Sequence, residues 1–288
     1  MKKSFIISFL LALTLIFPSI SFADAAPGDV IITLGENLSE EDKQKILTEM
    51  DAPETAVIIT VSNEEEHQYL GDYIPKATIG TRALSSSAIT IGEQDSGLEV
   101  TVNNITRITE EMYTNALITA GVKDATIYIT APMPVSGTAA LTGIIKAYEL
   151  SSDEAIPEDV KQVANEEMVT TSELGDTIGA DKAAALIAKI KDEVAKNAPE
   201  TDADLRAIIE NAAKELGITL SDADIQRLID LFNKMKELNI DWNQVGEQLN
   251  LAKEKVFNFL ESEEGQTFLD KFKDFFISLI DAIKAIFS

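Results

Sequence analysis

The feature that most constrains the fold of this chain is a change of hydrophobic period near Leu150. Before that residue, short β-branched runs alternate with helical segments, and after it only helical periods follow. Strands that alternate with helices predict a sheet covered by helices, whereas successive amphipathic helices predict a bundle. We therefore expect an α+β protein, with an N-terminal α/β domain over residues 24–150 and an all-α helical domain over residues 151–288.

The first half predicts the element order βαβαββαβα and a mixed sheet. The expected strands cover residues 30–34, 57–61, 83–91, 98–105 and 125–130, and the expected helices cover 39–50, 63–73, 109–120 and 137–150. The unbroken run 57–61 is typical of a strand covered on both faces. The turn-rich residues 92–97 predict a hairpin between the third and fourth strands, and Asn63 is the expected cap of the second helix.

The second half predicts a series of amphipathic helices behind a linker at residues 151–157. Each helix repeats apolar residues at i, i+3 or i+4, which gives it one buried side. The four apolar stripes are Ala183/Ile187/Ile190/Val194, Leu205/Ile208/Ala212/Leu216, Ile225/Leu228/Phe232/Met235 and Trp242/Val245/Leu249/Ala252/Val256. We expect the helical domain to have a core separate from that of the α/β domain.

The N-terminus has the order of residues that is typical of a secretory signal peptide. Lys2 and Lys3 precede an apolar stretch over residues 5–17, and Ser21 and Ala23 supply the small residues of a cleavage site. We expect a signal peptide over residues 1–23, with cleavage after Ala25 as an alternative. The apolar stretch is shorter than the roughly 20 residues of a membrane span. The absence of cysteine excludes a lipobox.

The charge of the chain limits its partners. The sequence has 24 Lys+Arg against 49 Asp+Glu, a formal net charge of -25. Such a field repels nucleic acid and anionic lipid, so we expect no nucleic-acid partner. Cations, basic surfaces and neutral molecules stay open as partners, beside the simpler interpretation of a soluble, aggregation-resistant surface.

One pattern occurs twice, as L-G-x-x-L-S-x-x-D at residues 34–42 and 216–224. A duplication would explain it, but so would the shared requirements of a helix start. A serine cap accepts a hydrogen bond from the amide three residues on, where an acidic residue also favours the positive end of the helix. We favour the capping explanation because the flanking elements differ in type.

No recognisable catalytic set is present. The single histidine, His67, follows three glutamates at a predicted helix start, where we expect a surface residue. The serine-hydrolase, zinc-peptidase and calcium-loop motifs are all missing, so we expect no metal and no cofactor. A carboxylate pair of the glycosidase kind stays open, because 49 acidic residues offer many pairs.

The most suggestive segment for binding is residues 131–143, which joins a predicted strand to a predicted helix. Ser136, Gly137 and Thr138 stand at the helix start, where free amides can hold an anion or a carboxylate. Ligands of α/β sheets bind at the carboxyl ends of strands. Arg82 is among the few basic residues nearby in sequence and could add charge. The alternative is that Ser136 is only a cap and Gly137 only a close packing contact.

The end of the chain carries a broad apolar stripe. Residues 266–288 combine phenylalanine, leucine and isoleucine on one side with three acids and three bases on the other. Surface-binding membrane helices usually have a basic polar face. We therefore favour packing against the helical domain or a second subunit, with docking on a membrane or a partner as the alternative.

Several segments resemble the YpuA-like exported proteins of Gram-positive bacteria. They are residues 28–35 (GDVIITLG), 67–71 (HQYLG), 79–83 (IGTRA), 111–117 (EMYTNAL), 135–143 (VSGTAALTG) and 241–242 (DW). The resemblance runs along nearly the whole chain and implies a Gram-positive envelope setting. That family is a domain of unknown function, so the resemblance assigns no catalytic or binding residue.

Together these features predict a secreted or extracellular, cell-envelope protein that is acidic and non-enzymatic. We expect it to bind an unidentified protein or small-molecule partner. A carboxylate-dependent hydrolase acting on wall polymer is the alternative, and a ligand-binding module is a third hypothesis.

Export is directly testable. Expressed in a Gram-positive host, the protein is expected outside the cytoplasmic membrane, and N-terminal sequencing should begin at Asp24 or Ala26. An intact Met1 on a protein that fractionates with the cytoplasm would refute the signal peptide.

Overall fold

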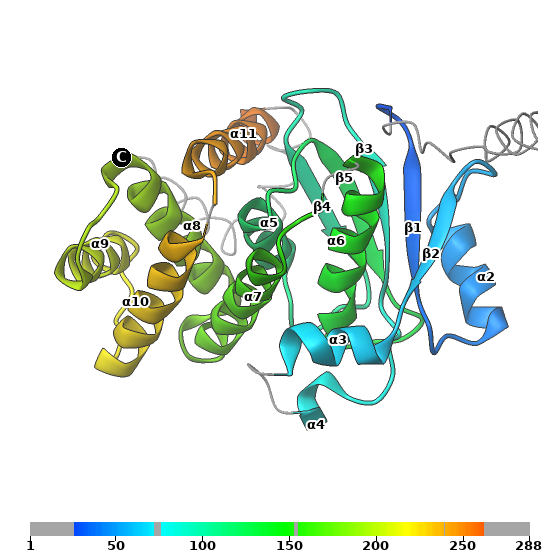
Figure 1. Cartoon of the computed structure of the whole chain (residues 1–288), viewed down its shortest axis with the longest axis horizontal. Helices are drawn as coiled ribbons and strands as arrows, with labels where there is room; N and C mark the ends of the chain where they lie inside the picture. Colours follow the sequence, from blue (N-terminus) through cyan, green and yellow to red (C-terminus); the bar gives the residue numbers. More distant parts are fainter. Residues whose placement is uncertain (1–25, 72–75, 153–154, 239, 262–288) are drawn as a thin grey trace, which may run out of the picture.

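A computed structural model of the chain describes residues 26–71, 76–152, 155–238 and 240–261 (Figure 1). The predicted signal peptide over residues 1–23 and the apolar C-terminal segment 266–288 lie outside the described residues. Within the described part of the chain, no helix is both long enough and apolar enough to cross a membrane.

The described elements follow the predicted order closely, with one added short helix. The strands are β1 (Val30–Gly35), β2 (Val57–Val61), β3 (Ser86–Ile91), β4 (Leu98–Val102) and β5 (Ala125–Thr130). The helices are α2 (Glu40–Glu49), α3 (Asn63–Leu70), α4 (Lys76–Ile79), α5 (Glu110–Thr119), α6 (Thr138–Ser152), α7 (Glu158–Ile178), α8 (Ala180–Asn197), α9 (Asp202–Glu215), α10 (Asp222–Glu237) and α11 (Trp242–Glu261). The short α4 was not predicted.

The five described strands form one mixed sheet in the order β2-β1-β3-β5-β4. β1 pairs with β2 in parallel, β4 pairs with β5 in parallel, and β3 is antiparallel to both of its neighbours, β1 and β5. The carboxyl ends of the other four strands therefore meet at one edge of the sheet. A mixed sheet followed by helices confirms the predicted α+β class.

The predicted hairpin between the third and fourth strands is wrong, because β5 lies between β3 and β4. The chain does reverse direction over residues 92–97, but this connection spans the width of a strand. Asp124, just before β5, holds both ends of it. The Asp124 carbonyl oxygen accepts from Gly92 N at 2.6 Å, and its Oδ1 accepts from Gly97 N at 2.9 Å. A turn-rich loop alone cannot distinguish these two arrangements.

The prediction that residues 57–61 are covered on both faces is also wrong. β2 is an edge strand, and its Val57 and Ile58 are 47% and 50% exposed. Its free edge is partly occupied by a helix side chain, since Lys146 Nζ of α6 donates to the Thr60 carbonyl oxygen at 2.9 Å and pairs with Glu65 at 2.6 Å. A continuous β-branched run therefore indicates a strand here, but not its place in the sheet.

Helices cover both faces of the sheet. α5 and α6 pack on one face, in the main core with Ile31, Ile89 and Ile127. α2 packs on the other face through Ile46, against the neighbouring set that includes Ile32. The C-terminal end of α2 is tied to this face by Glu49, whose Oε1 accepts from Asn103, Tyr128 and Thr130, each at 2.8 Å. Ile31 and Ile32 are neighbours in β1, so successive residues of one strand pack on opposite faces of the sheet.

The predicted apolar stripes are confirmed in the described second half, apart from Val256, which lies outside the residues whose burial the structure describes. The four stripes fall on α8, α9, α10 and α11. Ser221 caps α10 in a capping box with Asp224, and Ser39 caps α2 by accepting from Asp42 N. The repeated L-G-x-x-L-S-x-x-D pattern thus has a capping function at both sites. At α3, however, the cap is Ser62 rather than Asn63.

The expectation of separate cores for the two halves is wrong. The main hydrophobic core joins residues of the sheet, α5 and α6 to Met168 of α7, Ala184 of α8 and Val245 of α11. A second core lies within α7–α10. In Figure 1, α5 and α7 stand side by side between the sheet and the helices α8, α9 and α10. The helical half therefore has a core of its own and also shares the main core with the sheet.

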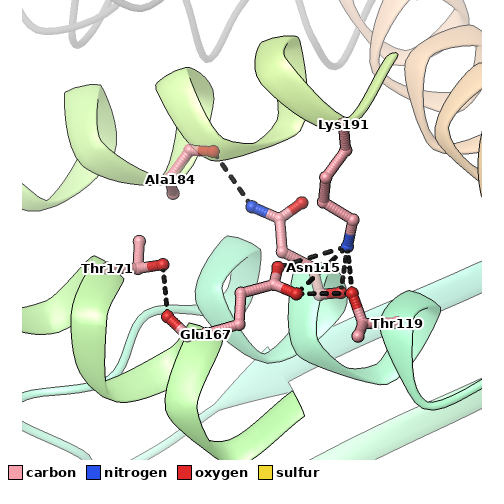
Figure 2. A network of polar contacts seen from close by, with 6 residues as sticks. All are labelled: Asn115, Thr119, Glu167, Thr171, Ala184 and Lys191. Atoms are coloured by element: carbon pink, nitrogen blue, oxygen red, sulfur yellow. Dashed lines mark hydrogen bonds and ion pairs between the residues drawn. The ribbon is translucent and has the colours of Figure 1, made fainter. Parts of the chain in front are cut away.

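A fully buried polar network crosses this junction (Figure 2). Lys191 of α8 and Glu167 of α7 are both 0% exposed. The three ammonium protons of Lys191 have three kinds of acceptor: the Asn115 carbonyl oxygen at 2.6 Å, Thr119 Oγ1 at 2.7 Å and the Glu167 carboxylate at 3.2 Å. The Thr119 hydroxyl in turn donates to Glu167 Oε2, and Asn115 Nδ2 donates to the Ala184 carbonyl oxygen at 2.9 Å.

The network is satisfied, but each charge in it depends on the other. Burial lowers the pKa of Lys191, and the opposing charge and hydrogen bond of Glu167 act to raise it. Removing one member of a buried ion pair typically costs about 3–5 kcal/mol, because the other charge is left uncompensated, whereas replacing both by apolar groups can be neutral.

We therefore expect Lys191→Met to lower the free energy of unfolding by about 3–5 kcal/mol, and Lys191→Met/Glu167→Leu to recover most of that loss. Urea unfolding followed by circular dichroism measures both. Lys196→Met is the matched control, since Lys196 lies on the same helix in an ion pair where its side chain is 59% exposed, and its expected cost is at most about 1 kcal/mol. Equal losses for the Lys191 and Lys196 variants would show that the buried pair has no special role.

Candidate functional site

A cleft of about 260 Å³ lies at the carboxyl ends of the parallel strands, and we call it the strand-end cleft. It is enclosed by the start of α6, by α3 and by the segment that leads into β3. Its lining residues are Glu66, Ile79, Gly80, Thr81, Arg82, Leu84, Ser85, Val135, Ser136, Gly137, Thr138 and Ala139. All four residues singled out from the sequence, Arg82, Ser136, Gly137 and Thr138, therefore lie around one cleft.

Gly137 is fixed by close packing. Its φ is +95°, a conformation that side chains rarely adopt, and a Cβ there would lie 2.4 Å from Tyr113 Oη and 2.6 Å from Ile105 Cγ2. The buried Tyr113 hydroxyl donates to the Gly137 carbonyl oxygen at 2.5 Å. The packing explanation thus applies to this glycine, and a Gly137→Val variant would disturb the core before it reported on binding.

Ser136 has a different position from the helix cap considered above. Its Oγ lies 3.4 Å from Thr138 Oγ1, and it accepts no hydrogen bond from the first-turn amides of α6 among the described contacts. The Thr138 and Ala139 amides likewise have no acceptor in the described part of the chain. The start of α6 therefore presents unpaired N–H groups at the cleft, as helix starts do unless they are capped.

Glu66 is a site residue that the sequence reasoning missed. It is 1% exposed and accepts hydrogen bonds from Thr138 Oγ1 and Asn63 Nδ2, both at 3.0 Å. Burial raises the pKa of Glu66, and the two hydrogen bonds act to lower it. Glu66 lies one helical turn before the buried Leu70, so its i, i+4 spacing from an apolar residue was the available signal. The run of three glutamates concealed it.

Arg82 supplies the positive charge of the strand-end cleft. Its side chain is exposed, and no hydrogen bond or ion pair of it is found among the described residues. Its backbone is held in place by a neighbour, because the next residue, Ala83, is fully buried and its amide donates to Asn37 Oδ1 at 2.8 Å. The Arg82 guanidinium is thus an available donor on a fixed backbone.

His67 is half-buried, which corrects the expectation of a surface residue. Its Nε2 lies 3.0 Å from the Gly80 carbonyl oxygen. A carbonyl oxygen only accepts, so Nε2 donates in this contact, and Nδ1 has no hydrogen-bond partner in the described structure. The contact ties α3 to the segment carrying Arg82. Among the described residues, no group of three or more His, Cys, Asp or Glu side chains is placed to hold a metal ion.

The strand-end cleft thus combines three kinds of group. Unpaired amides and the Arg82 guanidinium offer donors to an anionic group, the Ser136 hydroxyl can donate or accept, and the base holds the buried carboxyl of Glu66. Such an arrangement can hold a small polar molecule at the start of α6. It does not contain a nucleophile paired with a histidine base among the residues that line it.

Comparison with known proteins identifies the family but not a function. Residues 34–252 match the model of a family described as "Protein of unknown function (DUF1002)". The chain is 60% identical over 276 residues to the "Uncharacterized protein YpuA" of Bacillus subtilis (strain 168), and this alignment covers 96% of the chain and 95% of that relative. No solved structure matches the chain. The chain therefore belongs to the DUF1002 family, and the resemblance to YpuA-like proteins is confirmed.

The buried carboxyl makes the stability of the cleft depend on pH. The pKa of Glu66 is raised above its ordinary value of 4.5 in the folded protein, so the folded state binds its proton more tightly. The resulting contribution of Glu66 to the stability of the folded protein is fully present below about pH 4.5, and it is lost as the pH rises through the pKa of Glu66 in the folded state. We expect Glu66→Gln to be stabilised relative to the wild type as the pH rises from 4 to 7, by about 2–4 °C in Tm. A thermal melt at each pH measures it.

The control is Glu210→Gln, which removes a half-exposed carboxylate on α9. Its Tm difference from the wild type should change little with pH, since surface ion pairs contribute little to stability. A Glu66→Gln difference that is equally independent of pH would contradict the raised pKa.

Proposed function

We propose that this member of the DUF1002 family is an exported, acidic, non-enzymatic protein of the cell envelope that binds a small carboxylate-bearing ligand in the strand-end cleft. The single observation that carries the proposal is the convergence of Arg82, Ser136 and Thr138 at the start of α6. The export and the envelope setting rest on the N-terminal sequence, the lack of cysteine and the YpuA-like resemblance.

The donors of the cleft favour an anionic group. The guanidinium of Arg82 offers a fork of N–H donors that matches a carboxylate. The amides of Thr138 and Ala139 add unpaired donors at the positive end of α6. In a chain with a formal net charge of -25, a cation that lines a cleft and has no ion pair among the described residues is an informative exception.

Glu66 restricts which anion fits. Its carboxyl group lies at the base of the cleft, 3.0 Å from Thr138 Oγ1. Nearby charges of like sign repel one another, so a doubly charged phosphate would be disfavoured more strongly than a singly charged carboxylate. The proposed ligand is therefore a monoanion that carries a polar but uncharged body.

The alternative of a carboxylate-dependent hydrolase requires a second acid beside the first. Glycosidases place two carboxyl groups across the scissile bond, roughly 5–10 Å apart. Glu66 is the single acidic residue among those lining the strand-end cleft. Both of its oxygens already accept hydrogen bonds from the protein, which suits a fixed structural carboxyl better than a proton donor to a substrate.

The test uses N-acetyl-D-alanine as the probe, because it combines one carboxylate with a polar amide. Isothermal titration calorimetry of the purified mature protein should show saturable 1:1 binding. Arg82→Gln should weaken this binding by about 10- to 100-fold, the loss of one charge-assisted interaction. N-acetyl-D-alaninamide, which differs by lacking the negative charge, should bind weakly or not at all.

Arg206→Gln is the matched control, since Arg206 lies on α9 in exposed ion pairs away from the cleft. It should leave binding of the probe unchanged. Equal affinity for the acid and the amide, an equal loss in the Arg82 and Arg206 variants, or no binding of the acid would each overturn the proposal.

A further inference from the structure

A second and larger cleft, of about 640 Å³, lies at the opposite end of the sheet, and we call it the α11 cleft. It is formed where β3 ends and β4 and β5 begin, between the end of α6 and the first turns of α11. Its lining residues are Ile91, Gly92, Gln94, Asp95, Lys123, Asp124, Tyr148, Ser151, Ser152, Asp241, Asn243, Gln244, Glu247 and Gln248. None of these residues belongs to the strand-end cleft.

The α11 cleft is strongly acidic. Four carboxylates line it against one lysine, Lys123. Two of the acids have structural partners: Asp124 accepts from Gly97 N, and Asp241 caps α11 by accepting from the Asn243 and Gln244 amides. The other two, Asp95 and Glu247, are exposed and have no hydrogen bond or ion pair among the described residues.

An acidic rim alone would be an ordinary solvated surface, but the cleft also contains a buried acceptor without a partner. Gln248 is 5% exposed, and its Oε1 has no hydrogen-bond partner in the described structure. Leaving such an atom unpaired is unfavourable, and nearly all buried polar atoms in folded proteins are paired. An acceptor in this position calls for a ligand with an N–H or O–H donor.

Tyr148 adds a surface suited to a cation. It is half-buried at the end of α6 and lines the cleft. The face of an aromatic ring attracts an ammonium or guanidinium group placed over it. Carboxylates at the rim, an aromatic ring and an amide oxygen are the groups that recognise organic cations.

The spacing of the acids excludes a simple metal site in the described part of the chain, where no group of three or more carboxylate or histidine side chains is close enough to hold an ion. A calcium ion needs six to eight oxygen ligands at about 2.3–2.6 Å. Dispersed carboxylates suit an extended ligand whose several positive groups reach different acids.

Direct contacts hold α11 against the sheet at this cleft. Gln244 Nε2 donates to the Gly121 carbonyl oxygen at 3.0 Å, which joins α11 to the turn before β5. Val245 is 1% exposed in the main core. A Cβ on Gly97 would lie 3.1 Å from Leu251 Cβ, so the start of β4 closely approaches α11. Binding would therefore need little rearrangement of the backbone.

We propose that the α11 cleft binds an organic cation with several N–H donors, of the polyamine class. Asp95 and Glu247 bind its outer ammonium groups, and Gln248 Oε1 accepts from a group that enters the cleft beside Tyr148. This site is independent of the proposed carboxylate ligand, because the two clefts share no residue.

Spermidine is the probe, titrated into the mature protein by calorimetry at 150 mM salt, so that diffuse attraction is screened. We expect saturable 1:1 binding that weakens about tenfold or more in Asp95→Asn/Glu247→Gln and in Gln248→Met. Asn is chosen at position 95 because Asp95 has a φ of +63°, which asparagine tolerates. The control, Glu200→Gln/Glu237→Gln, removes the same charge from exposed positions elsewhere and should bind as the wild type does.

Several outcomes would overturn this proposal. An equal loss in the control variant would show that spermidine responds only to the overall charge. Saturable binding of Ca²⁺ at the same stoichiometry, lost in the Asp95/Glu247 variant, would make the site a metal site. Wild-type affinity in Gln248→Met would remove the buried acceptor from the site, and no saturable binding of spermidine would refute the site as a whole.

Discussion

The buried contact of Lys191 with Glu167, Thr119 and Asn115 is the constraint on which the rest of the arrangement depends. Apolar packing is non-directional and would tolerate helices that slide by a residue. A charge with no access to water is stable only where every proton finds its acceptor. The network therefore defines how α7 and α8 sit on α5, and it places the helical half against the sheet in one register.

The sequence predicted the elements well and their spatial arrangement less well. Caps such as Ser39 and Ser221, and the i, i+3/i+4 stripes of α8–α11, are local features that the chain specifies residue by residue. The position of β5 between β3 and β4 depends on long-range pairing, and residues 92–97 fit a hairpin as well as a wider connection. The shared core was likewise hidden, because a stripe shows that a face is buried but not against which partner.

In the candidate site, too, local features were predicted from the sequence and long-range contacts were not. Ser136, Gly137 and Thr138 were found because hydroxyl and glycine residues between a strand and a helix have local meaning, and Arg82 joined them in space. Glu66 was missed and His67 was misjudged because their contacts come from segments distant in sequence, Thr138 of α6 for Glu66 and the Gly80 carbonyl for His67. Gln248 gave no signal at all, since a glutamine within an amphipathic helix is ordinary until its oxygen is left without a partner.

The edge strand β2 has a consequence for how copies of the protein behave towards one another. Its exposed Val57 and Ile58 lie on one of the two edge strands of the described sheet, where another chain could add a strand, and uncovered edges of this kind start intermolecular sheet growth. Lys146 reaches the outward-facing carbonyl of Thr60, and a charge at that position is incompatible with a continuing ladder. Among the described strands, Lys146 thus places a charged side chain where a further strand would pair beside β2, which disfavours the addition of a neighbouring molecule's strand at this edge.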